Sequence, residues 1–591
     1  MAKFVLIDHS LKGIGGHNYE YAVHILRTAE QRGFRPVLAA WRGFRDGRRL
    51  PDDWTLHTPY RHTTYQSDRV VRKLDALATV DTDEAPMLSR TWHRFRRRGL
   101  DRKLDRFTDR FARATANLFE REGIEPGDQV FVPTISPTDL AGLVRFFRST
   151  PEASQVHWHL QFHFKIYAGM EPDYPQQDER LDGVRQIFRD CLAAMPAEKL
   201  HFYTTTDQVT RQYNRLGMVP FQTLPYPVDP AFHLAAGDRR ERRTLRATCL
   251  GGLRQEKGPS NLPLVLQRLW DDYFETGRLQ LVVQSRSAAK LPAALRELVE
   301  QEQSTTGLRA RREARVPSNS TSSVDGRGGP SYSKKIDMVG WPLSTEEYRQ
   351  TILDSDIGLL LYDREQYYIR CSGVMVEMLA AGIPVIATAG CWMADQLADP
   401  IYRHREHLRR TLPEVESADV LDGDELAVPD GASHLFVSFR RIEPTGPGVY
   451  VDVRIDQRDA AGTALGSSHE VLGGRPDGQP TPVLVPVRPG TRSIRLQTAN
   501  AYGDVPVVVR QDDIAFLSAD ASCPQGAVGL IAADAEQVPE LLRDMIDHYD
   551  HYRATAGEFS KQWGPWHSPQ QVTTILLEQS AWQCGQVTPA A

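Results

Sequence analysis

Cysteine is scarce in this chain, and its few cysteines stand far apart. No two form a Cys-x-x-Cys pair; the six are Cys191, Cys249, Cys371, Cys391, Cys523 and Cys584. Such spacing disfavours both a disulfide framework and a thiolate zinc site. We therefore expect reduced thiols, in a cytoplasmic protein with no metal site.

Long apolar runs and an excess of one charge are also missing. No stretch of about 18 apolar residues occurs, so no membrane span is predicted. The opening MAKFVLIDHS reads directly into a strand and lacks the apolar run of a signal peptide. Lysine and arginine number 71 against 76 aspartates and glutamates, a net charge of −5, so nucleic acid is not an expected partner.

What is present is an ordinary globular composition, 41% hydrophobic and 25% charged. This composition disfavours collagen-like, coiled-coil and wholly disordered chains. A single hydrophobic core stops growing beyond about 250–300 residues. The 591 residues of this chain therefore predict several domains.

The chain opens with the pattern of a Rossmann-like sheet. Residues 4–8 predict a strand, KGIGGHN follows, and apolar residues then recur at helical spacing as far as Gly33. RPVLAAW is the next predicted strand, which completes a strand, glycine loop, helix and strand. Three further segments are strand-like: 129–133, 156–161 and 200–205.

A second α/β region begins near residue 245. Ser344 and Glu347 have the spacing of a capping box at the start of one of its helices. The predicted strands lie within 247–253, 279–285, 336–341, 357–362 and 384–390. Residues 303–334 are rich in Ser, Thr, Arg, Gly and Pro and predict a mobile loop.

From about residue 430 to 520 the pattern changes to alternating strands separated by turns, which predicts a small β-sandwich. Strand-then-helix character returns afterwards, so we expect the sandwich to be inserted in the second α/β region. The predicted fold class is α/β, with two Rossmann-like domains and an inserted all-β sandwich. The expected boundaries are 1–230, 231–429, 430–520 and 521–591, the last segment completing the second domain.

Three constellations carry chemistry, and the first is the loop Gly13-x-Gly15-Gly16. A glycine loop that enters a helix exposes N–H groups at the positive end of the helix dipole, which suits a diphosphate. A tight turn between strand and helix is an equally good interpretation of this loop alone. The chain lacks a G-x-G-x-x-G with an acidic residue about 20 positions later, which disfavours NAD.

The second constellation is GGLRQEKG, residues 251–258, directly after a predicted strand. Arg254 and Lys257 would stand at the carboxyl end of a parallel strand, where ligands bind in such sheets. Two cations there could neutralise the phosphates of a leaving nucleoside diphosphate. The alternative is a solvated basic turn.

The third and most specific constellation spans residues 362–386. Ser372-Gly373-Val374 opens a predicted helix, whose free N–H groups offer a second anion site. Glu377 lies about one turn into this helix, where its carboxylate can accept two hydrogen bonds from a ribose diol. The alternative for Glu377 is a first-turn glutamate that favours the helix dipole.

Four motifs in this order resemble the GT-B glycosyltransferases, in particular the retaining family-4 glycosyltransferases: GGHNYEYA, GGLRQEKG, SGVMVEMLAAGIPVIA and AVGLIAADAEQVPELLRDMI. The resemblance covers about residues 1–43, 125–425 and 524–580. It implies two Rossmann-like domains that face each other across a cleft and close over the donor.

The resemblance also implies roles for single residues. Lys257 would contact the donor diphosphate, and Glu377 would bind the nucleotide ribose. Backbone N–H groups of Ser372, Gly373 and Val374 would face the distal phosphate. The other implied site residues are Gly15, Gly16, Arg254 and Arg370 at the donor, and His163 near the sugar, with His157 and His159 as competitors.

Two positions depart from the family pattern. The family usually has a glutamate that contacts the donor sugar eight residues before the ribose glutamate, and Ile369 stands there in this chain. Arg370 or Asp363 would have to take over these contacts. The family also has arginine directly after the first glycine of its phosphate motif. Gly252 stands there in this chain, so Arg254 would reach instead.

The implied activity is transfer of a sugar from a nucleotide-sugar donor to a glycan or glycoconjugate acceptor, with retained anomeric configuration and without a metal or cofactor. The leaving phosphate would help to deprotonate the acceptor hydroxyl, while the protein stabilises diphosphate charge and excludes water. Ile369 motivates an alternative, a non-catalytic scaffold that binds glycan or nucleotide sugar. A sugar phosphorylase or epimerase of the same fold is a further alternative.

Two segments outside these motifs have alternative interpretations. The predicted sandwich resembles carbohydrate-binding jelly-roll modules in strand pattern, and could bind a glycan or a partner. Alternation nevertheless places most of its aromatic residues in the core: Phe436, Phe439, Tyr450, Tyr502 and Phe516. Residues 91–110, with eight basic and three acidic residues, predict a solvated helix face; contact with anionic lipid at the inner face of the membrane is the alternative.

Overall fold

A computed structural model describes most of the chain. The described residues are 1–14, 17–44, 50–78, 87–171, 173–236, 243–252, 254–301, 335–411, 425–443, 450–473, 480–500, 508–518 and 526–583. Gly15 and Gly16, the expected loop at 303–334 and Tyr502 lie outside these residues.

The first domain is built on a seven-stranded parallel sheet with the order β3-β2-β1-β4-β5-β6-β7. Its strands are β1 (Lys3–Asp8), β2 (Arg35–Trp41), β3 (Thr55–Tyr60), β4 (Gln129–Ile135), β5 (His157–Phe162), β6 (Leu200–Thr204) and β7 (Gln222–Thr223). The central strands are apolar runs that are buried along almost their whole length. Such strands require helices on both faces of the sheet.

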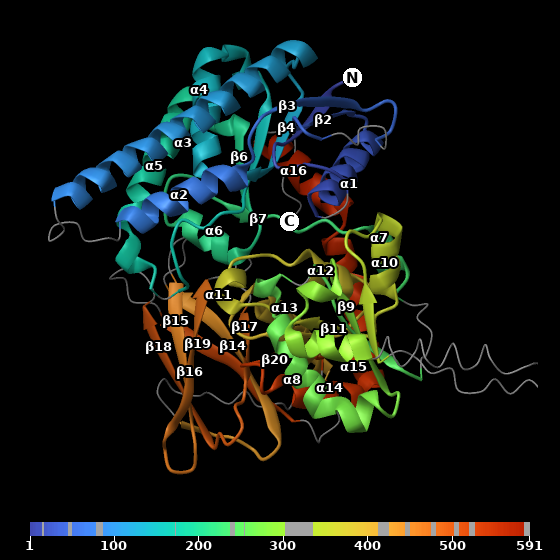
Figure 1. Ribbon diagram of the computed structural model, residues 1–591. Coiled ribbons are helices and arrows are strands. Elements are labelled where there is room, and N and C mark those ends of the chain that lie inside the picture. The colour runs from blue at the N-terminus through green and yellow to red at the C-terminus, as the bar shows by residue number, and fades with distance from the viewer. Residues whose placement is uncertain are drawn as a thin grey trace, which may run out of the picture.

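Helices cover both faces of this sheet (Figure 1). They are α1 (His17–Gln31), α2 (Thr64–Ala78), α3 (Met87–Glu122), α4 (Pro137–Ser149), α5 (Glu179–Ala194) and α6 (Asp207–Asn214). Helices α3, α4 and α5 share one hydrophobic cluster with the sheet, whereas α1 belongs to another on the opposite face.

The second domain contains a six-stranded parallel sheet with the order β10-β9-β8-β11-β12-β20. Its strands are β8 (Leu245–Cys249), β9 (Leu279–Gln284), β10 (Ile336–Val339), β11 (Ile357–Leu360), β12 (Val385–Thr388) and β20 (Gly529–Ala532). The strand order reverses between β8 and β11. In such sheets the crevice outside the carboxyl ends at this switch point is the usual ligand site.

The helices of the second domain surround this sheet. They are α7 (Pro230–Leu234), α8 (Leu262–Leu269), α10 (Thr345–Leu353), α11 (Arg364–Tyr367), α12 (Gly373–Ala380), α13 (Trp392–Thr411), α14 (Val538–Asp547) and α15 (Tyr549–Trp566). The predicted capping box of Ser344 and Glu347 is confirmed at the start of α10. The segment after α8 continues as a π-helical turn over Trp270–Phe274.

Between α13 and β20 the chain forms an inserted all-β region, here called the β insert (residues 425–518). Its strands are β13 (Glu425–Ala427), β14 (Ala432–Glu443), β15 (Tyr450–Arg458), β16 (Ala464–Gly473), β17 (Thr481–Pro486), β18 (Ser493–Asn500) and β19 (Val508–Ser518). They form antiparallel sheets ordered β13-β18-β15-β16 and β17-β14-β19, which share one apolar cluster. The predicted fold class is confirmed, whereas the jelly-roll strand order stays a prediction.

The last helix, α16 (Pro569–Gln583), returns to the first domain. Val572 and Leu576 are fully buried in the cluster that contains Ala22 and Leu26 of α1. Figure 1 shows α16 beside α1. Among the described residues, no helix has both the length and the apolar character needed to cross a membrane.

Candidate functional site

The candidate site lies at the carboxyl ends of β8 and β11, where the strand order of the second sheet reverses. Past the end of β8 the backbone turns at Gly251 and Gly252, with φ of +100° and +77°. A Cβ atom on Gly251 would lie 1.9 Å from Nζ of Lys257. Glycine is therefore needed here both for its left-handed backbone and for the close approach of this lysine.

Lys257 is buried at this turn, with 3% of its surface exposed. Its Nζ donates to Oη of Tyr362 (3.2 Å) and lies 4.8 Å from the centre of that ring. Burial, together with the charge of Arg254, lowers the pKa of Lys257 to about 8. A buried cation without a carboxylate hydrogen bond is a suitable partner for a ligand anion.

Ser372 caps α12, the helix that follows β11. Its Oγ accepts from the backbone N–H of Met375 (3.3 Å), and its carbonyl accepts from Val376. The first N–H groups of a helix have no partner within the helix. The N–H groups of Gly373 and Val374 thus lie at the positive end of α12, beside the crevice.

Glu377 is buried on the same helix, with 7% of its surface exposed. Oη of Tyr348, on α10, donates to Oε2 of Glu377 (2.5 Å). Burial raises the pKa of Glu377 to about 8, against the lowering effect of the Tyr348 hydrogen bond. The burial of Glu377 therefore disfavours the alternative interpretation, a solvated glutamate that only interacts with the helix dipole.

Lys257 and Glu377 come together although 120 positions separate them in the sequence. Burial dominates both pKa values, and the charge of each residue also acts on the other. Tyr362 hydrogen-bonds with Lys257, and Tyr348 with Glu377. The second and third constellations of the sequence thus lie within electrostatic range of each other. The two tyrosines were not predicted.

Arg254 and Arg370 lie at the border between the two domains. Arg254 is exposed and pairs with Glu256 (3.3 Å). The guanidinium of Arg370 lies 5.8 Å from the ring centre of Tyr367. Both arginines lie within electrostatic range of Tyr65 on α2 of the first domain, so cationic side chains of the second domain face the first domain here.

Of the three candidate histidines, His163 alone lies beyond the carboxyl end of β5. Its Nε2–H donates to the carbonyl of Pro133 (2.6 Å), and burial lowers its pKa to about 4. His157 and His159 lie inside the strand, where their rings stack on His201. The latter two are structural residues of the sheet.

Ile369 and Asp363, the residues considered in connection with the missing sugar-contacting glutamate, have different surroundings. Ile369 is buried, with 6% exposure, in the main apolar cluster of the first domain. Asp363 is exposed, and its side chain accepts from the N–H of Gln366 at the start of α11. Neither residue reproduces the sugar-contacting glutamate.

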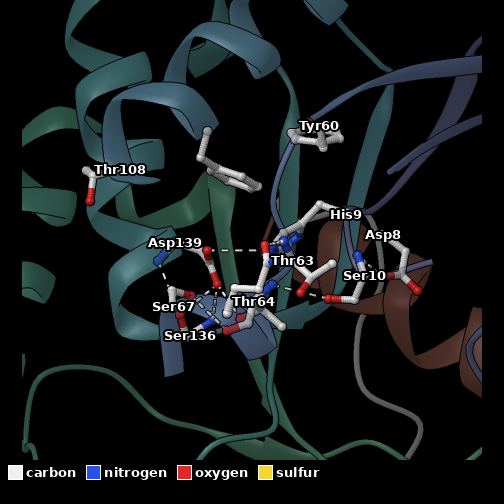
Figure 2. Close-up of polar contacts among 12 residues, drawn as sticks. Asp8, His9, Ser10, Tyr60, Thr63, Thr64, Ser67, Thr108, Ser136 and Asp139 are labelled. Carbon is white, nitrogen blue, oxygen red and sulfur yellow. Dashed lines mark hydrogen bonds and ion pairs between the residues drawn. The ribbon is translucent and has the colours of Figure 1, made fainter. Parts of the chain in front are cut away.

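A polar cluster at the carboxyl edge of the first sheet was not predicted (Figure 2). Asp139 accepts from Oγ1 of Thr64 (2.5 Å) and from the N–H of Ser136 (3.0 Å). Nε2 of His9 lies 3.4 Å from the other oxygen of Asp139. Burial raises the pKa of Asp139, but His9 and these hydrogen bonds more than offset that effect and hold it below its ordinary value.

This cluster joins the ends of β1, β3 and β4 and is almost completely buried. It therefore braces the sheet edge instead of facing a ligand. The capping box of Ser136 and Asp139 was the sequence signal that could have revealed it. Asp8 points away from the cluster (Figure 2) and accepts from the N–H of Ser10 (2.9 Å); burial raises its pKa to about 6.

The described residues contain no group of three or more His, Cys, Asp or Glu side chains that could hold a metal ion. The expected glycine loop cannot be placed in the site, because Gly15 and Gly16 lie outside the described residues.

No protein-family model matches the chain, and no curated protein matches it. Several solved structures are similar. A UDP-forming α,α-trehalose-phosphate synthase from Burkholderia xenovorans is 15% identical, with a TM-score of 0.39 over 67% of this chain and 86% of that one. WaaG, a glycosyltransferase involved in lipopolysaccharide biosynthesis, is 14% identical, with a TM-score of 0.34 over 68% and 84% of the two chains.

Proposed function

We propose that the protein is a glycosyltransferase of the hexosyltransferase type, which moves a sugar from a nucleotide-sugar donor to a glycan or glycoconjugate acceptor. The observation that carries the proposal is the meeting of Lys257 and Glu377 at the carboxyl edge of the second sheet. A buried cation beside a helix N-terminus suits a diphosphate, and a buried carboxylate one turn further suits a ribose diol.

Several of the proposed donor contacts use groups that are held in place before the donor binds. Lys257 and the N–H groups of Gly373 and Val374 hold the diphosphate, with Ser372 fixing the start of the helix. Glu377 binds the ribose, positioned by its hydrogen bond from Tyr348. Arg254, Arg370, Gly15 and Gly16 complete the donor site in this proposal.

The chemistry that we propose is transfer with retained configuration and without a metal. Charge builds up on the leaving diphosphate, and preorganised cations and N–H groups stabilise it. The leaving phosphate accepts the proton of the acceptor hydroxyl. Because Nε2–H of His163 already donates to Pro133, Nδ1 is the atom through which His163 would accept a hydrogen bond from the sugar.

We also propose the division into an acceptor-side domain (1–230), a nucleotide-binding domain (231–429 with 521–591) and the insert between them (430–520). In this division most of the donor contacts come from the second domain, whereas Gly15, Gly16 and His163 come from the first. The acceptor then enters from the side of the first domain.

Thermal-shift binding against a panel of nucleoside diphosphates and nucleotide sugars tests the proposal. We expect one nucleotide to stabilise the protein, and Lys257→Ala and Glu377→Ala each to weaken its binding about 10- to 150-fold, the cost of losing a hydrogen bond to a charged group. Lys561→Ala, which removes an exposed lysine of α15, should bind as the wild type does. A folded protein that no nucleotide stabilises would contradict the proposal.

The position of Ile369 favours a second candidate, a scaffold that binds a nucleotide sugar or glycan without catalysis. The residue that replaces the sugar-contacting glutamate is buried in another domain and cannot contact the sugar. Turnover separates the two candidates. Nucleotide binding with neither transfer nor donor hydrolysis would favour the scaffold, whereas release of nucleoside diphosphate, lost in Lys257→Ala, would favour the enzyme.

A further inference from the structure

The loop that joins β11 to α12, residues 361–372, is here called the donor loop. It belongs to the second domain in sequence, but its centre packs on the first. The side chain of Ile369 lies in the apolar cluster that contains Val209 and Tyr213 of α6. Burying this side chain removes apolar surface from water and so stabilises the contact.

Two hydrogen bonds with the first domain hold the same part of the loop. Oγ1 of Thr206 donates to the carbonyl of Ile369 (2.8 Å). Oη of Tyr368 donates to a carboxylate oxygen of Glu171, which also accepts from Arg211 (2.7 Å). The side chain of Glu171 is fully buried. Separating the domains would thus take away one partner of a buried carboxylate.

Two neighbouring segments strengthen this contact. Gln208 of α6 donates to Asp395 near the start of α13, and the N–H of Trp392 donates to the carbonyl of Tyr368 (3.2 Å). Tyr450 of the β insert is buried in the same apolar cluster as Ile369. The donor loop, the start of α13 and Tyr450 of the β insert therefore all pack against the first domain.

The domains also touch at α1 and α10, but this contact is exposed. Oγ1 of Thr345 on α10 donates to Oε1 of Glu20 on α1 (2.6 Å), and this bond is exposed. Figure 1 shows α1 and α10 on one side of the molecule, and α6 and α11 on the other. An exposed hydrogen bond is easily exchanged for bonds to water, whereas a buried apolar contact is not.

We propose that Tyr368 and Ile369 are positioning residues that anchor the donor loop to the first domain, so that the two domains stay together before any donor binds. Motion of the cleft is then a rotation about this anchor, which opens the side of Glu20 and Thr345. The anchor also sets Arg370 and the start of α12 relative to the first domain. This inference goes beyond the proposed function and does not depend on it.

Small-angle X-ray scattering of the full chain without ligand tests the anchor directly. We expect the wild type to have the radius of gyration of the structure, and nucleoside diphosphates to change it little. Ile369→Glu places a carboxylate in the apolar cluster, so its radius of gyration should increase while its far-ultraviolet circular dichroism is unchanged. A wild type that compacts on adding nucleotide, or an Ile369→Glu curve that superimposes on that of the wild type, would overturn the proposal.

A milder variant keeps the test valid if Ile369→Glu does not fold. Tyr368→Phe removes only the hydroxyl that donates to Glu171. We expect amide hydrogen exchange to accelerate about tenfold in both α6 and the donor loop, because the two open together. Tyr273→Phe, which removes a tyrosine–carboxylate bond to Asp547 within the second domain, is the control and should leave both segments unchanged. Acceleration in neither segment of Tyr368→Phe would refute the anchor.

This design separates the anchor from the proposed enzymatic activity. Scattering and hydrogen exchange are measured without substrate, so they hold whether or not the protein transfers sugar. If nucleotide binding is then found, Tyr368→Phe should change the apparent nucleotide affinity while Tyr273→Phe should not. An equal affinity in both variants would contradict the positioning role of Tyr368.

Discussion

A buried carboxylate such as that of Glu377 makes the stability of the protein depend on pH. Burial raises its pKa to about 8, from an ordinary value of 4.5. The folded protein therefore holds a proton that the unfolded chain releases between these values. The stabilisation from this proton is complete below pH 4.5 and is lost as pH rises through 8.

We expect Glu377→Gln to remove this dependence, because the amide has the shape of the protonated acid and does not ionise. The variant should match the wild type near pH 5 and exceed its free energy of unfolding by roughly 2–5 kcal/mol at pH 9. Denaturant unfolding at both pH values measures the difference. Glu558→Gln, at an exposed position of α15, is the control; equal stability of wild type and Glu377→Gln at pH 9 would contradict the raised pKa.

At the residue scale, local sequence patterns predicted short-range contacts well, but they did not predict contacts between residues far apart in the sequence. The capping box of Ser344 and Glu347 followed from spacing alone and is present. The proximity of Lys257 and Glu377 is consistent with their positions after a strand end and at a helix start. Tyr348 has no such signal, because its contact with Glu377 joins residues 29 positions apart on different helices.

The charged residues of helix α3 are distributed differently near its start and in its middle. Asp105 and Asp109 pair with Arg145 of α4, so the middle of the helix is bound to the first domain. The exposed basic residues nearer its start have no acidic residue among them: Arg94, Arg96, Arg97 and Arg98. The solvated face predicted from the sequence fits the middle of the helix, whereas the arginine-rich start suits an anionic surface.

We therefore expect the start of α3 to bind vesicles that contain anionic lipid at low salt. Replacing its four arginines with glutamine should cost about 4 kcal/mol, at about 1 kcal/mol per basic residue near the surface. Cosedimentation with anionic and neutral vesicles measures this binding. The matched control removes the same charge further along the helix, at Arg102, Lys103, Arg106 and Arg110. Equal sedimentation of both quadruple variants would exclude a specific role for the start of the helix.

The aromatic residues of the β insert are used for packing. Phe439 is buried within the insert, Phe436 is buried against the second domain, and Tyr450 is buried against the first domain. A glycan-binding face requires exposed rings on which sugars can stack. These three residues do not provide one, so the structure favours the insert as a part of the domain contact.

Tyr450→Ala should accordingly destabilise the contact between the β insert and the first domain. We expect a loss of roughly 3–5 kcal/mol, the range for truncating a buried aromatic side chain. Tyr450→Phe keeps the ring and should cost less than about 1.5 kcal/mol, the range for swaps that conserve volume. Denaturant unfolding measures both, and hydrogen exchange in α6 locates the effect. An alanine variant as stable as the phenylalanine variant would show that the ring is not a packing element.

At the element scale, the sequence predicted strands from periodicity and missed elements whose pattern is weak. β13 is only three residues long, and β16 (ALGSSHEVLG) mixes small and polar residues that hide its alternation. The helix face predicted over 91–110 lies within α3, but the full length of 36 residues was not predicted, because charged side chains dominate the first half and the apolar stripe is short. In each case tertiary packing supplies what local pattern lacks.

At the scale of the whole molecule, neither α/β domain is formed by one continuous segment of the chain. The return of strand-then-helix character after residue 520 correctly predicted that the β region is an insertion. The anchor at Ile369 could not be predicted in this way. Comparison with the family motif shows only that Ile369 stands where a glutamate is usual. Its burial in the first domain depends on how the two domains pack against each other, which local sequence does not indicate.

The C-terminal helix α16 couples the two domains by a second route, and this coupling can be tested. Leu576 is fully buried against α1, at the opposite end of the chain. We expect Leu576→Ala to lower the free energy of unfolding by roughly 2–5 kcal/mol and to speed up hydrogen exchange in α1 before it does so in α14. Glu578→Ala, at an exposed position of the same helix, should do neither. If exchange instead rose first in α14 and α15, the packing of α16 would stabilise the second domain more than the first. The anchor at Ile369 would then have to keep the two domains together without its help.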